Sequence, residues 1–538
     1  MSQNAVTAAS YLTRLTSRTG KVLEWTPSAG DPDRTIARIW LVSLQRITSH
    51  HGTFAQELLR VLAWFAPTDI PVPLLYALPD TSTSQIDEAL GRLAAYALIT
   101  RDGEAVTVHR MVQTAARHTT THEPTEAQAV DTACRQAIGV LLEIAPPHSD
   151  PAGWALWRRL APHIDALTAN HGPTDNSALL ALVDAEALYL EEQGQVARSI
   201  VLFEQNLVDC ERVLGPEHPW TLTSRNNLAG AYESAGVLVQ AIPLYEGNVV
   251  DCERVLGPDH RNTLTSRNNV AHAYRAAGNL SRAIPLYEHV VVDFERVLGP
   301  DHPDTLISRN NLAEVYAVAG DLSRAIPLYE HNVVDCERAL GPDHPTTLTS
   351  RNDLANAYES AGHLDRAIPL YEQNLADRER VLGPDHPSTL ASRNNLAYVY
   401  QAVGDLDRAI PLFEQILVDC ERVLGPDHPH TLTFCNNLAA AYRAVGDLDR
   451  AIPLYEQNLA DRQRVLGPDH PDTLSSRNNL AYAYRATGDL ARAIPLYERN
   501  LAERERVLGL DHPDTQAAHY NLAAAYKAAE DTDQAEPN

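Results

Sequence analysis

Eight histidines, each preceded by an acidic residue, are the first candidates for chemistry in this chain. An acidic residue beside a histidine could hold a metal ion or transfer a proton. Stacked helices lie about 8–10 Å apart and each repeat would insert two, so neighbouring copies are too far apart to share ligand bonds of about 2 Å. We therefore expect these histidines to stabilise turns, with no metal site and no catalytic residue. They recur every 42 residues, as His218, His260, His302, His344, His386, His428, His470 and His512.

Motifs for nucleotide binding and covalent catalysis are also missing. No Gly-x-Ser-x-Gly, His-Glu-x-x-His or Cys-x-x-Cys pattern occurs. A phosphate-binding loop needs Gly-x-x-x-x-Gly-Lys-Ser/Thr, and the segment from Thr19 to Val22 lacks both the upstream glycine and the hydroxyl residue. We expect no cofactor, no ATP binding and no enzymatic activity.

The stretch from Thr389 to Pro429 is typical of the elements that carry these histidines. Apolar residues lie at helical spacing before and after Gly404, and Gly425-Pro426 follows them. This pattern predicts two amphipathic helices separated by a glycine break and ended by a glycine stop. A fixed period of 42 residues predicts a stack of such helix pairs.

The order Leu-Ala-x-x-Tyr, Gly, Ala-x-x-x-Phe/Tyr resembles the tetratricopeptide repeat, whose usual period is 34 residues. The eight additional residues, the Asn-Asn-Leu-Ala start and the Leu-Gly-x-Asp-His-Pro junction resemble the 42-residue repeats of kinesin light chain. The resemblance implies a mainly α protein, a right-handed α-solenoid of tetratricopeptide repeats. We expect a degenerate first repeat at 173–215, seven repeats at 216–508, and a C-terminal capping helix with a polar tail at 509–538.

A different pattern precedes the repeats. Helices are predicted at Thr35–Ile47, Thr53–Phe65, from Ile70 and at Ser84–Tyr96, followed by a hairpin around Asp102 and Gly103. This segment resembles the winged-helix part of bacterial NB-ARC/STAND signalling ATPases, and the sequence would then begin where their ATPase module ends. We expect a helical lead-in at 1–34, a small winged-helix-like domain at 35–121 and a linking helical pair at 122–172.

Composition narrows the choice of partners and compartment. The formal net charge is −26, and because residues 1–124 carry 11 acidic and 11 basic side chains, all of it falls on residues 125–538. Such a solenoid repels nucleic acid and anionic membranes, and we expect neither as a partner. The predicted recognition helix, Gln85–Arg92, has two acids against one arginine. Six cysteines without disulfide spacing and no signal-peptide core indicate a cytoplasmic protein with reduced thiols.

The first helix of each repeat remains as the candidate binding element. At 100° per residue, Arg393, Leu396 and Tyr400 share one face, and Asn395 and Tyr398 lie on the other. We expect the first face to pack and the second to line a concave groove. The recurrent arginine would then lie beside the core, with its head group on a carboxylate of a neighbouring helix.

Asparagines at the matching positions of kinesin-light-chain-type repeats hold the main chain of an extended peptide. The resemblance implies the same role here, with Asp353 as a departure. Positions that vary between copies would set specificity, and they make the C-terminal half of the groove basic and aromatic. The expected groove residues are Asn227, Asn269, Asn311, Asn395, Asn437, Asn479, Arg275, Tyr398, Arg443, Tyr482, Arg485 and Lys527.

The leading hypothesis is a non-enzymatic scaffold or sensor in a signalling or regulatory role. Its ligand would be a protein or an extended acidic peptide with one aromatic residue, because the basic half of the groove offers cations and an aromatic platform. Two alternatives stay open. One is a regulator that contacts nucleic acid through the winged helix, and the other is the sensor half of a split or truncated NB-ARC-type ATPase whose ATPase partner is encoded separately.

Overall fold

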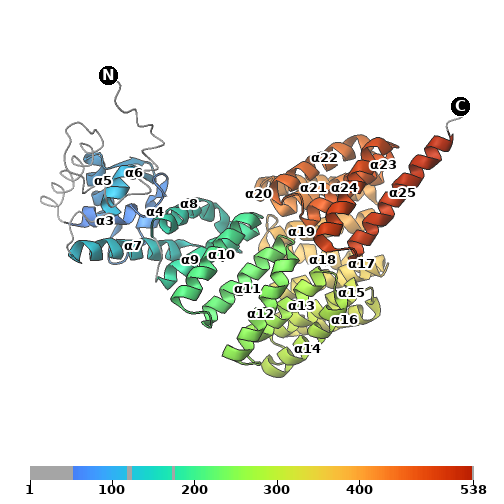
Figure 1. The fold of residues 1–538 in the computed structure, drawn as a ribbon, viewed down its shortest axis with the longest axis horizontal. Helices are drawn as coiled ribbons and strands as arrows, with labels where there is room; N and C mark the ends of the chain where they lie inside the picture. Colours follow the sequence, from blue (N-terminus) through green and yellow to red (C-terminus); the bar gives the residue numbers. More distant parts are fainter. Residues whose placement is uncertain (1–52, 118–123, 172–175, 536–538) are drawn as a thin grey trace, which may run out of the picture. The chain divides into compact units, whose positions relative to one another are not determined.

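The computed structural model describes residues 53–117, 124–171 and 176–535. The predicted lead-in (1–34) and the predicted helix Thr35–Ile47 lie outside these residues. The chain divides into two compact units, Met1–Glu186 and Ala187–Asn538, and each is considered by itself (Figure 1).

The first unit contains a small three-stranded antiparallel sheet. The strand order is β1-β3-β2, with Ile70 opposite Val106 and Ile99 opposite Val108. The β2–β3 turn uses Gly103 with a φ of 58°, a conformation that favours glycine. The order helix, strand, two helices and hairpin is typical of a winged helix. The elements are α3 (Phe54–Leu62), β1 (Ile70–Pro71), α4 (Val72–Leu75), α5 (Thr83–Ala95), β2 (Ile99–Asp102), β3 (Ala105–Val108) and α6 (Arg110–Arg117).

Two longer helices of this unit are α7 (Pro124–Ile144) and α8 (Trp154–His171), and the boundary with the second unit falls within α9 (Ser177–Glu192). The side chain of His163 in α8 is buried and bridges the segment after α3. Its Nδ1 accepts from the Ala66 amide at 3.1 Å, and its Nε2 lies 3.2 Å from the Asp69 carbonyl oxygen. Burial lowers the pKa of His163 to about 4, so the ring is neutral and α8 is hydrogen-bonded to the small domain at neutral pH.

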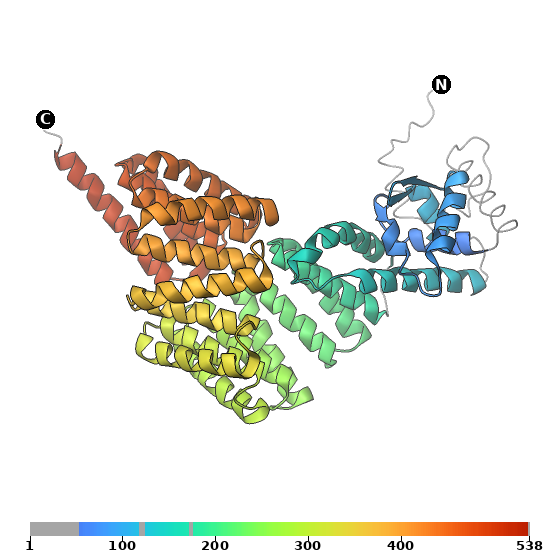
Figure 2. The same cartoon turned by 180° about the vertical axis from the view of Figure 1, so that it is seen from behind.

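The second unit is built from helix pairs joined by short turns (Figure 2). The first pair falls within the predicted degenerate repeat, seven pairs fall within the predicted 42-residue repeats, and α25 follows. The predicted mainly α solenoid is confirmed. The helices are α9 (Ser177–Glu192), α10 (Val196–Val213), α11 (Pro219–Ser234), α12 (Leu238–Leu256), α13 (Arg261–Ala276), α14 (Leu280–Leu298), α15 (Pro303–Val318), α16 (Leu322–Leu340), α17 (Pro345–Ser360), α18 (Leu364–Leu382), α19 (Pro387–Ala402), α20 (Leu406–Val423), α21 (Pro429–Ala444), α22 (Leu448–Val465), α23 (Pro471–Ala486), α24 (Leu490–Leu508) and α25 (Pro513–Ala535).

The junction histidines begin the first helix of every repeat, as expected of turn-stabilising residues. In α19, His386 is the N-cap, and its Nδ1 accepts from the Ser388 amide at 3.1 Å. Pro387 follows at the first helical position, where a missing amide hydrogen costs nothing. The junction aspartate forms an ion pair. Asp385 lies 2.7 Å from Arg422 of α20, the second helix of the repeat that follows the junction. The acidic residue and the histidine are therefore structural elements of the junction.

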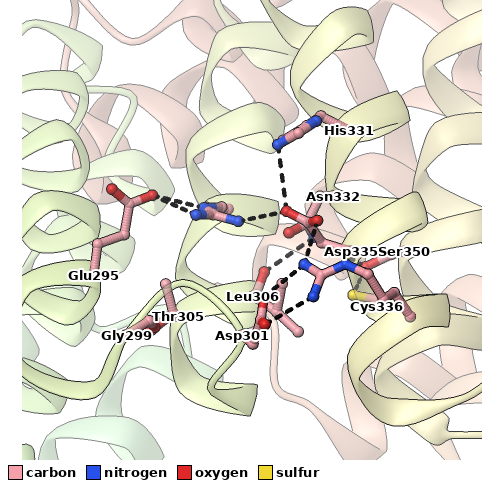
Figure 3. A network of polar contacts seen from close by, with 12 residues as sticks. Glu295, Gly299, Asp301, Thr305, Leu306, His331, Asn332, Asp335, Cys336 and Ser350 are labelled. Carbon is pink, nitrogen blue, oxygen red and sulfur yellow. Dashed lines mark hydrogen bonds and ion pairs between the residues drawn. The ribbon is translucent and has the colours of Figure 1, made fainter.

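Ion pairs between successive helices hold the stack together. Arg351 in α17 pairs with Glu337 in the preceding helix at 2.7 Å and with Asp377 in the following helix at 2.9 Å. The same pattern recurs around Asp335, where side chains from neighbouring helices converge (Figure 3). The expectation that the recurrent arginine is structural and finds a carboxylate on a neighbouring helix is confirmed. In Arg477 the partner is Glu503 on the following helix.

Candidate functional site

The accessible strip along the first helices is narrower than predicted. In α19, Tyr398 is 51% exposed and Ala402 is exposed, whereas Asn395 and Gln401 are half-buried. Asn394, the residue before Asn395, is buried at 7% exposure. The neighbouring first helices cover it, because consecutive first helices contact each other as well as their own second helices.

The predicted groove asparagines form a ladder of side-chain amides that runs from repeat to repeat. The second asparagine of each pair donates from Nδ2 to Oδ1 of the first asparagine in the preceding repeat. One amide hydrogen is therefore used inside the protein, which leaves the second hydrogen and the carbonyl oxygen for other partners. Nothing in one repeat alone predicts this ladder. The links are Asn269 to Asn226, Asn311 to Asn268, Asn395 to Asn352, Asn437 to Asn394, Asn479 to Asn436 and Asn521 to Asn478, at 3.0 to 3.3 Å.

Asp353 reverses one link of this ladder. A carboxylate cannot donate, and Asp353 instead accepts from Nδ2 of Asn310 at 2.7 Å. The carbonyl oxygen of Asn310 is left buried without a hydrogen-bond partner. Burial raises the pKa of Asp353, which is the expected direction for a carboxylate removed from water.

The N-terminal half of the strip is internally paired. Arg275, predicted as a groove cation, donates to Glu314 at 2.7 Å and lies 2.7 Å from Nε2 of His272. His272 in turn contacts Glu233. These side chains come from α11, α13 and α15, so charges of successive repeats neutralise one another. Arg275 is not an uncompensated cation, and the sequence could not show this because the partners are about 40 residues away.

The C-terminal half differs in having two arginines stacked on one tyrosine. The guanidinium carbons of Arg443 and Arg485 lie 4.5 and 4.8 Å from the ring centroid of Tyr482. Tyr482 is 38% exposed. Within the part of the chain that the structure describes, no carboxylate pairs with either arginine. We call Arg443, Tyr482 and Arg485 the cationic cluster.

Two tyrosines of the second helices lie close to the cationic cluster. Tyr455 and Tyr497 are 0% and 1% exposed, and their hydroxyl oxygens have no hydrogen-bond partner. Burial raises the pKa of both hydroxyls, and the charge of Arg443 opposes that rise at each of them. The two hydroxyls are buried and out of reach of a ligand, whereas the guanidinium groups of Arg443 and Arg485 are hydrogen-bond donors without a carboxylate. This part of the strip is therefore suited to an anion through its two arginines.

The remaining predicted groove residues are more dispersed. Lys527 is exposed on α25, one repeat beyond the cationic cluster, and Tyr398 lies on α19, two repeats before Tyr482. Asn227 on α11 is half-buried. Of the predicted basic and aromatic groove residues, Arg443, Tyr482 and Arg485 are the three that stack together.

Other kinds of site find no support among the described residues. They include no group of three or more histidine, cysteine and acidic side chains that could hold a metal ion. No helix there has the length and hydrophobicity needed to cross a bilayer. Burial raises the pKa of Cys420 to about 12 and of Cys435 to about 11, which makes these thiols poor nucleophiles.

The predicted recognition helix of the first unit, α5, presents little uncompensated positive charge. Arg92 pairs with Glu88 four residues before it, and Arg101 of β2 pairs with Asp87 at 3.0 Å. Groove-reading helices need arginine or lysine that is available for phosphates and base edges. The side chains of α5 are therefore poorly suited to DNA.

Comparison with known proteins agrees with the geometry. One tetratricopeptide repeat family matches residues 178–246, 310–376, 433–502 and 477–538, and a second matches 263–304 and 389–430. Together these segments cover more than half of the sequence. The chain belongs to the tetratricopeptide repeat family. No match was found among curated proteins.

Several solved structures are similar to parts of this tetratricopeptide repeat protein. A kinesin light chain of Podosopora anserina with nearly identical repeats is 36% identical, with 38% of this chain and 97% of that chain covered and a TM-score of 0.33. A STAND protein with a tetratricopeptide repeat sensor from Pyrococcus horikoshii is 15% identical, with 93% and 70% covered and a TM-score of 0.48. A Rap protein complexed with Competence and Sporulation Factor is 14% identical, with 65% and 99% covered and a TM-score of 0.39.

Proposed function

We propose that this tetratricopeptide repeat protein is a non-enzymatic scaffold or sensor that binds an extended acidic peptide along its first helices. Tetratricopeptide repeats are suited to protein–protein interaction, and the observation that supports this ligand is the cationic cluster. Its two guanidinium groups lie over one tyrosine and neither pairs with a carboxylate, in a protein with 70 acidic and 44 basic residues. An acidic side chain of the ligand would supply the missing partner.

The stacking of the arginines favours a peptide that also carries an aromatic residue. Stacking on Tyr482 covers one face of each guanidinium group and leaves the N–H edges free for a carboxylate. It also fixes the two side chains, which lowers the conformational entropy lost on binding. An aromatic residue of the ligand next to its acidic residue could pack on the exposed edge of the tyrosine or on a guanidinium face.

The asparagine ladder would hold the main chain of the same peptide. Asn437 lies on α21 with Arg443, and Asn479 lies on α23 with Tyr482 and Arg485. Each asparagine keeps one amide hydrogen and its carbonyl oxygen for a ligand. Contacts to peptide main chain are independent of sequence, so affinity would come from the ladder and selectivity from the cluster.

The test uses a fluorescein-labelled ten-residue peptide of glutamates with one central phenylalanine, and a lysine counterpart. Fluorescence anisotropy should give micromolar affinity for the acidic peptide, with binding weakened as salt is raised from about 50 mM to about 500 mM. Replacing both cluster arginines, Arg443→Gln with Arg485→Gln, should raise Kd about tenfold or more, because a charge-assisted contact is lost at each position.

A matched control is available in the same repeats. Arg450 and Arg492 also stack on tyrosines, at 4.1 and 4.2 Å from the ring centroids of Tyr442 and Tyr484, but they pair with Asp447 and Asp489. Arg450→Gln with Arg492→Gln removes the same net charge and should leave Kd unchanged. Equal weakening by both pairs of substitutions, or preference for the lysine peptide, would contradict the proposed site.

A further inference from the structure

Three turns of the solenoid contact junctions that lie more than five repeats later in the sequence. The turn after α9 meets the start of α21, and the turn after α11 meets the start of α23. In both cases the two hydrogen-bonded residues are 236 positions apart in the sequence. The turn after α13 meets the start of α25 in the same way. Figure 1 and Figure 2 show α10 and α11 beside the α20–α21 region. The array therefore completes a turn and touches itself.

Junction histidines make the hydrogen bonds of these contacts. Nε2 of His428 lies 3.1 Å from the carbonyl oxygen of Glu192, and Nε2 of His470 lies 3.0 Å from that of Ser234. Each Nδ1 already accepts from a backbone amide at its own helix start, so Nε2 carries the hydrogen and donates. Glu192 and Ser234 are the last residues of α9 and α11, whose carbonyl groups have no partner within the helix.

The contacts are close enough to exclude a methyl group. A Cβ at Gly194 would lie 2.5 Å from Pro429, and one at Gly236 would lie 2.6 Å from Pro471. At Gly278 the nearest atom would be 3.1 Å away. The glycines at the same position of later repeats would meet nothing within 4 Å, and all of them are exposed: Gly320, Gly362, Gly404, Gly446 and Gly488.

The three contacting turns differ in sequence from the turns at the same position of later repeats, because they lack a charged residue after the glycine. We call the five later turns, whose glycine would meet nothing within 4 Å, the open turns. Four of them carry an aspartate after the glycine, paired with an arginine three residues later. The fifth has His363 there. The three contacting turns have Gln195, Val237 and Asn279 instead, all uncharged. Val237 and Asn279 are half-buried, and a carboxylate at either position would lose part of its water, so the absence of charge at these two positions is independent support for the contacts. Gln195 is exposed and adds no such support.

We propose that these three contacts form an intramolecular clasp that closes one turn of the solenoid and controls access to the groove. The contacting turns lie at the C-terminal ends of first helices, and the junctions lie at the N-terminal ends. The clasp therefore joins opposite edges of the helical array and closes the slit between successive turns. A peptide reaches the first helices through the open ends, or from the side after the clasp has opened.

The clasp is a weak interface, as a gate requires. It consists of two neutral hydrogen bonds and contacts by small groups of glycine, proline and histidine. Such an interface leaves the open state populated and lets a ligand that binds the open groove shift the equilibrium.

Alanine substitutions provide a test that needs no ligand. Gly194→Ala with Gly236→Ala inserts methyl groups into the clasp, whereas Gly362→Ala with Gly404→Ala inserts them into open space. All four glycines have φ between +72° and +82°, so both pairs impose similar backbone strain. Small-angle X-ray scattering of the full chain should show an increased maximum dimension for the first pair alone. An equal increase for both pairs would overturn the clasp.

Hydrogen exchange gives a second measurement, on the unmodified protein. The amides of Val237 and Asp405 have equivalent helix-end hydrogen bonds, to the carbonyl groups of Tyr232 and Tyr400. Because only Val237 follows a contacting glycine, its amide should exchange several-fold more slowly. Equal exchange rates would show that the clasp is open in solution.

If the glycine variants fail to fold, substitution of the two contacting histidines provides another test. Asparagine can still cap a helix but is too short to reach the distant carbonyl group. His428→Asn with His470→Asn should therefore enlarge the molecule in scattering, whereas His344→Asn with His386→Asn should not. If the maximum dimension stayed unchanged in both double variants, His428 and His470 would not stabilise the closed state.

Control of access rests on the proposed peptide function and is measured separately. In stopped-flow mixing with the labelled acidic peptide, the association rate should rise several-fold in the Gly194→Ala, Gly236→Ala variant and stay unchanged in the Gly362→Ala, Gly404→Ala control. Expansion in scattering without a faster association would overturn the gate. Absence of peptide binding in every variant would count against the proposed function and leave the scattering result on the clasp intact.

Discussion

At the scale of single residues, Asp353 shows how one atom changes a repeated network. Every other described link of the amide ladder runs from Nδ2 of one asparagine to Oδ1 of an asparagine in the preceding repeat. At Asp353 the donor is lost, and the Oδ1 of Asn310 is left buried and unbonded. A carboxylate that burial removes from water and an unbonded carbonyl oxygen both cost free energy.

Asp353→Asn should therefore stabilise the protein. The new amide can donate to Asn310, and we expect the free energy of unfolding at pH 7.5 to rise by about 1 kcal/mol. Urea denaturation measures the change, and the reverse substitution Asn395→Asp, at a complete link, is the matched control and should destabilise by a similar amount. A loss of stability in Asp353→Asn would show that the carboxylate has a favourable role.

The same substitution should depend on pH. Because the pKa of Asp353 is raised in the folded protein, the folded state binds this proton more readily than the unfolded state. The cost of the carboxylate is then fully present above the folded pKa and decreases as pH falls through it. The advantage of Asp353→Asn should accordingly be smaller at pH 5 than at pH 7.5.

Residue types predicted some contacts and not others. A recurrent arginine beside a packed face needs a carboxylate, and Arg393 indeed pairs with Glu379 on the preceding helix at 2.9 Å. The partners of Arg275 and the direction of the asparagine ladder could not be predicted. They depend on the offset between first helices of successive repeats, which is a property of the stack and not of any one helix.

At the scale of elements, local signals placed most helices within a few residues of their bounds. The predicted helix Ser84–Tyr96 is α5, at Thr83–Ala95, where the side chain of Ser82 caps it. The two-residue strand β1 was missed and a helix was predicted from Ile70, because pairing with β3 is a long-range contact. The last helix continues to Ala535, into the predicted polar tail, since no proline interrupts the sequence before Pro537.

A core substitution should act locally in this stack. Tyr400 is 7% exposed, donates to Glu372 at 2.8 Å and stacks under Arg408. Tyr400→Ala should destabilise by about 3–5 kcal/mol, as expected for the loss of a large buried side chain. Each repeat contacts only its neighbours along the stack, so hydrogen exchange should accelerate in α18 to α21.

The first unit serves as the internal control for this measurement. Residues 53–117 belong to a separate compact unit and should keep their protection in Tyr400→Ala. Equal loss of protection in both units would mean that they unfold as one, and the picture of a one-dimensional stack would be wrong.

At the scale of the whole molecule, the inter-turn contacts are the feature that the sequence could predict least. A small rotation per repeat accumulates over more than five repeats, so the register of the contact cannot be read from one copy. The sequence carries one sign of the contact: uncharged residues replace the aspartate of the open turns at Gln195, Val237 and Asn279. These departures from the repeat are informative only after the structure shows what they face.

Protons should act on the clasp through its two histidines. Burial lowers the pKa of His428 to about 4, helped by neighbouring His430 and opposed by the Glu192 carbonyl. Burial also lowers the pKa of His470, where Asp472 and the Ser234 carbonyl oppose the shift and Arg462 adds to it. The closed state removes both rings from water, and burial disfavours the charged form, so a protonated ring fits the closed state poorly.

Acidification should therefore open the clasp. In the open state each ring meets water and has a pKa near 6.5, whereas the closed state holds it lower. A group with a lowered pKa stabilises the closed state fully above about pH 6.5 and loses that effect as pH falls through the closed-state value. Small-angle X-ray scattering should show the maximum dimension increasing between pH 7 and pH 4.5. The Gly194→Ala, Gly236→Ala variant, already open, should change little over this range, and an equal expansion in that variant would assign the effect to groups outside the clasp.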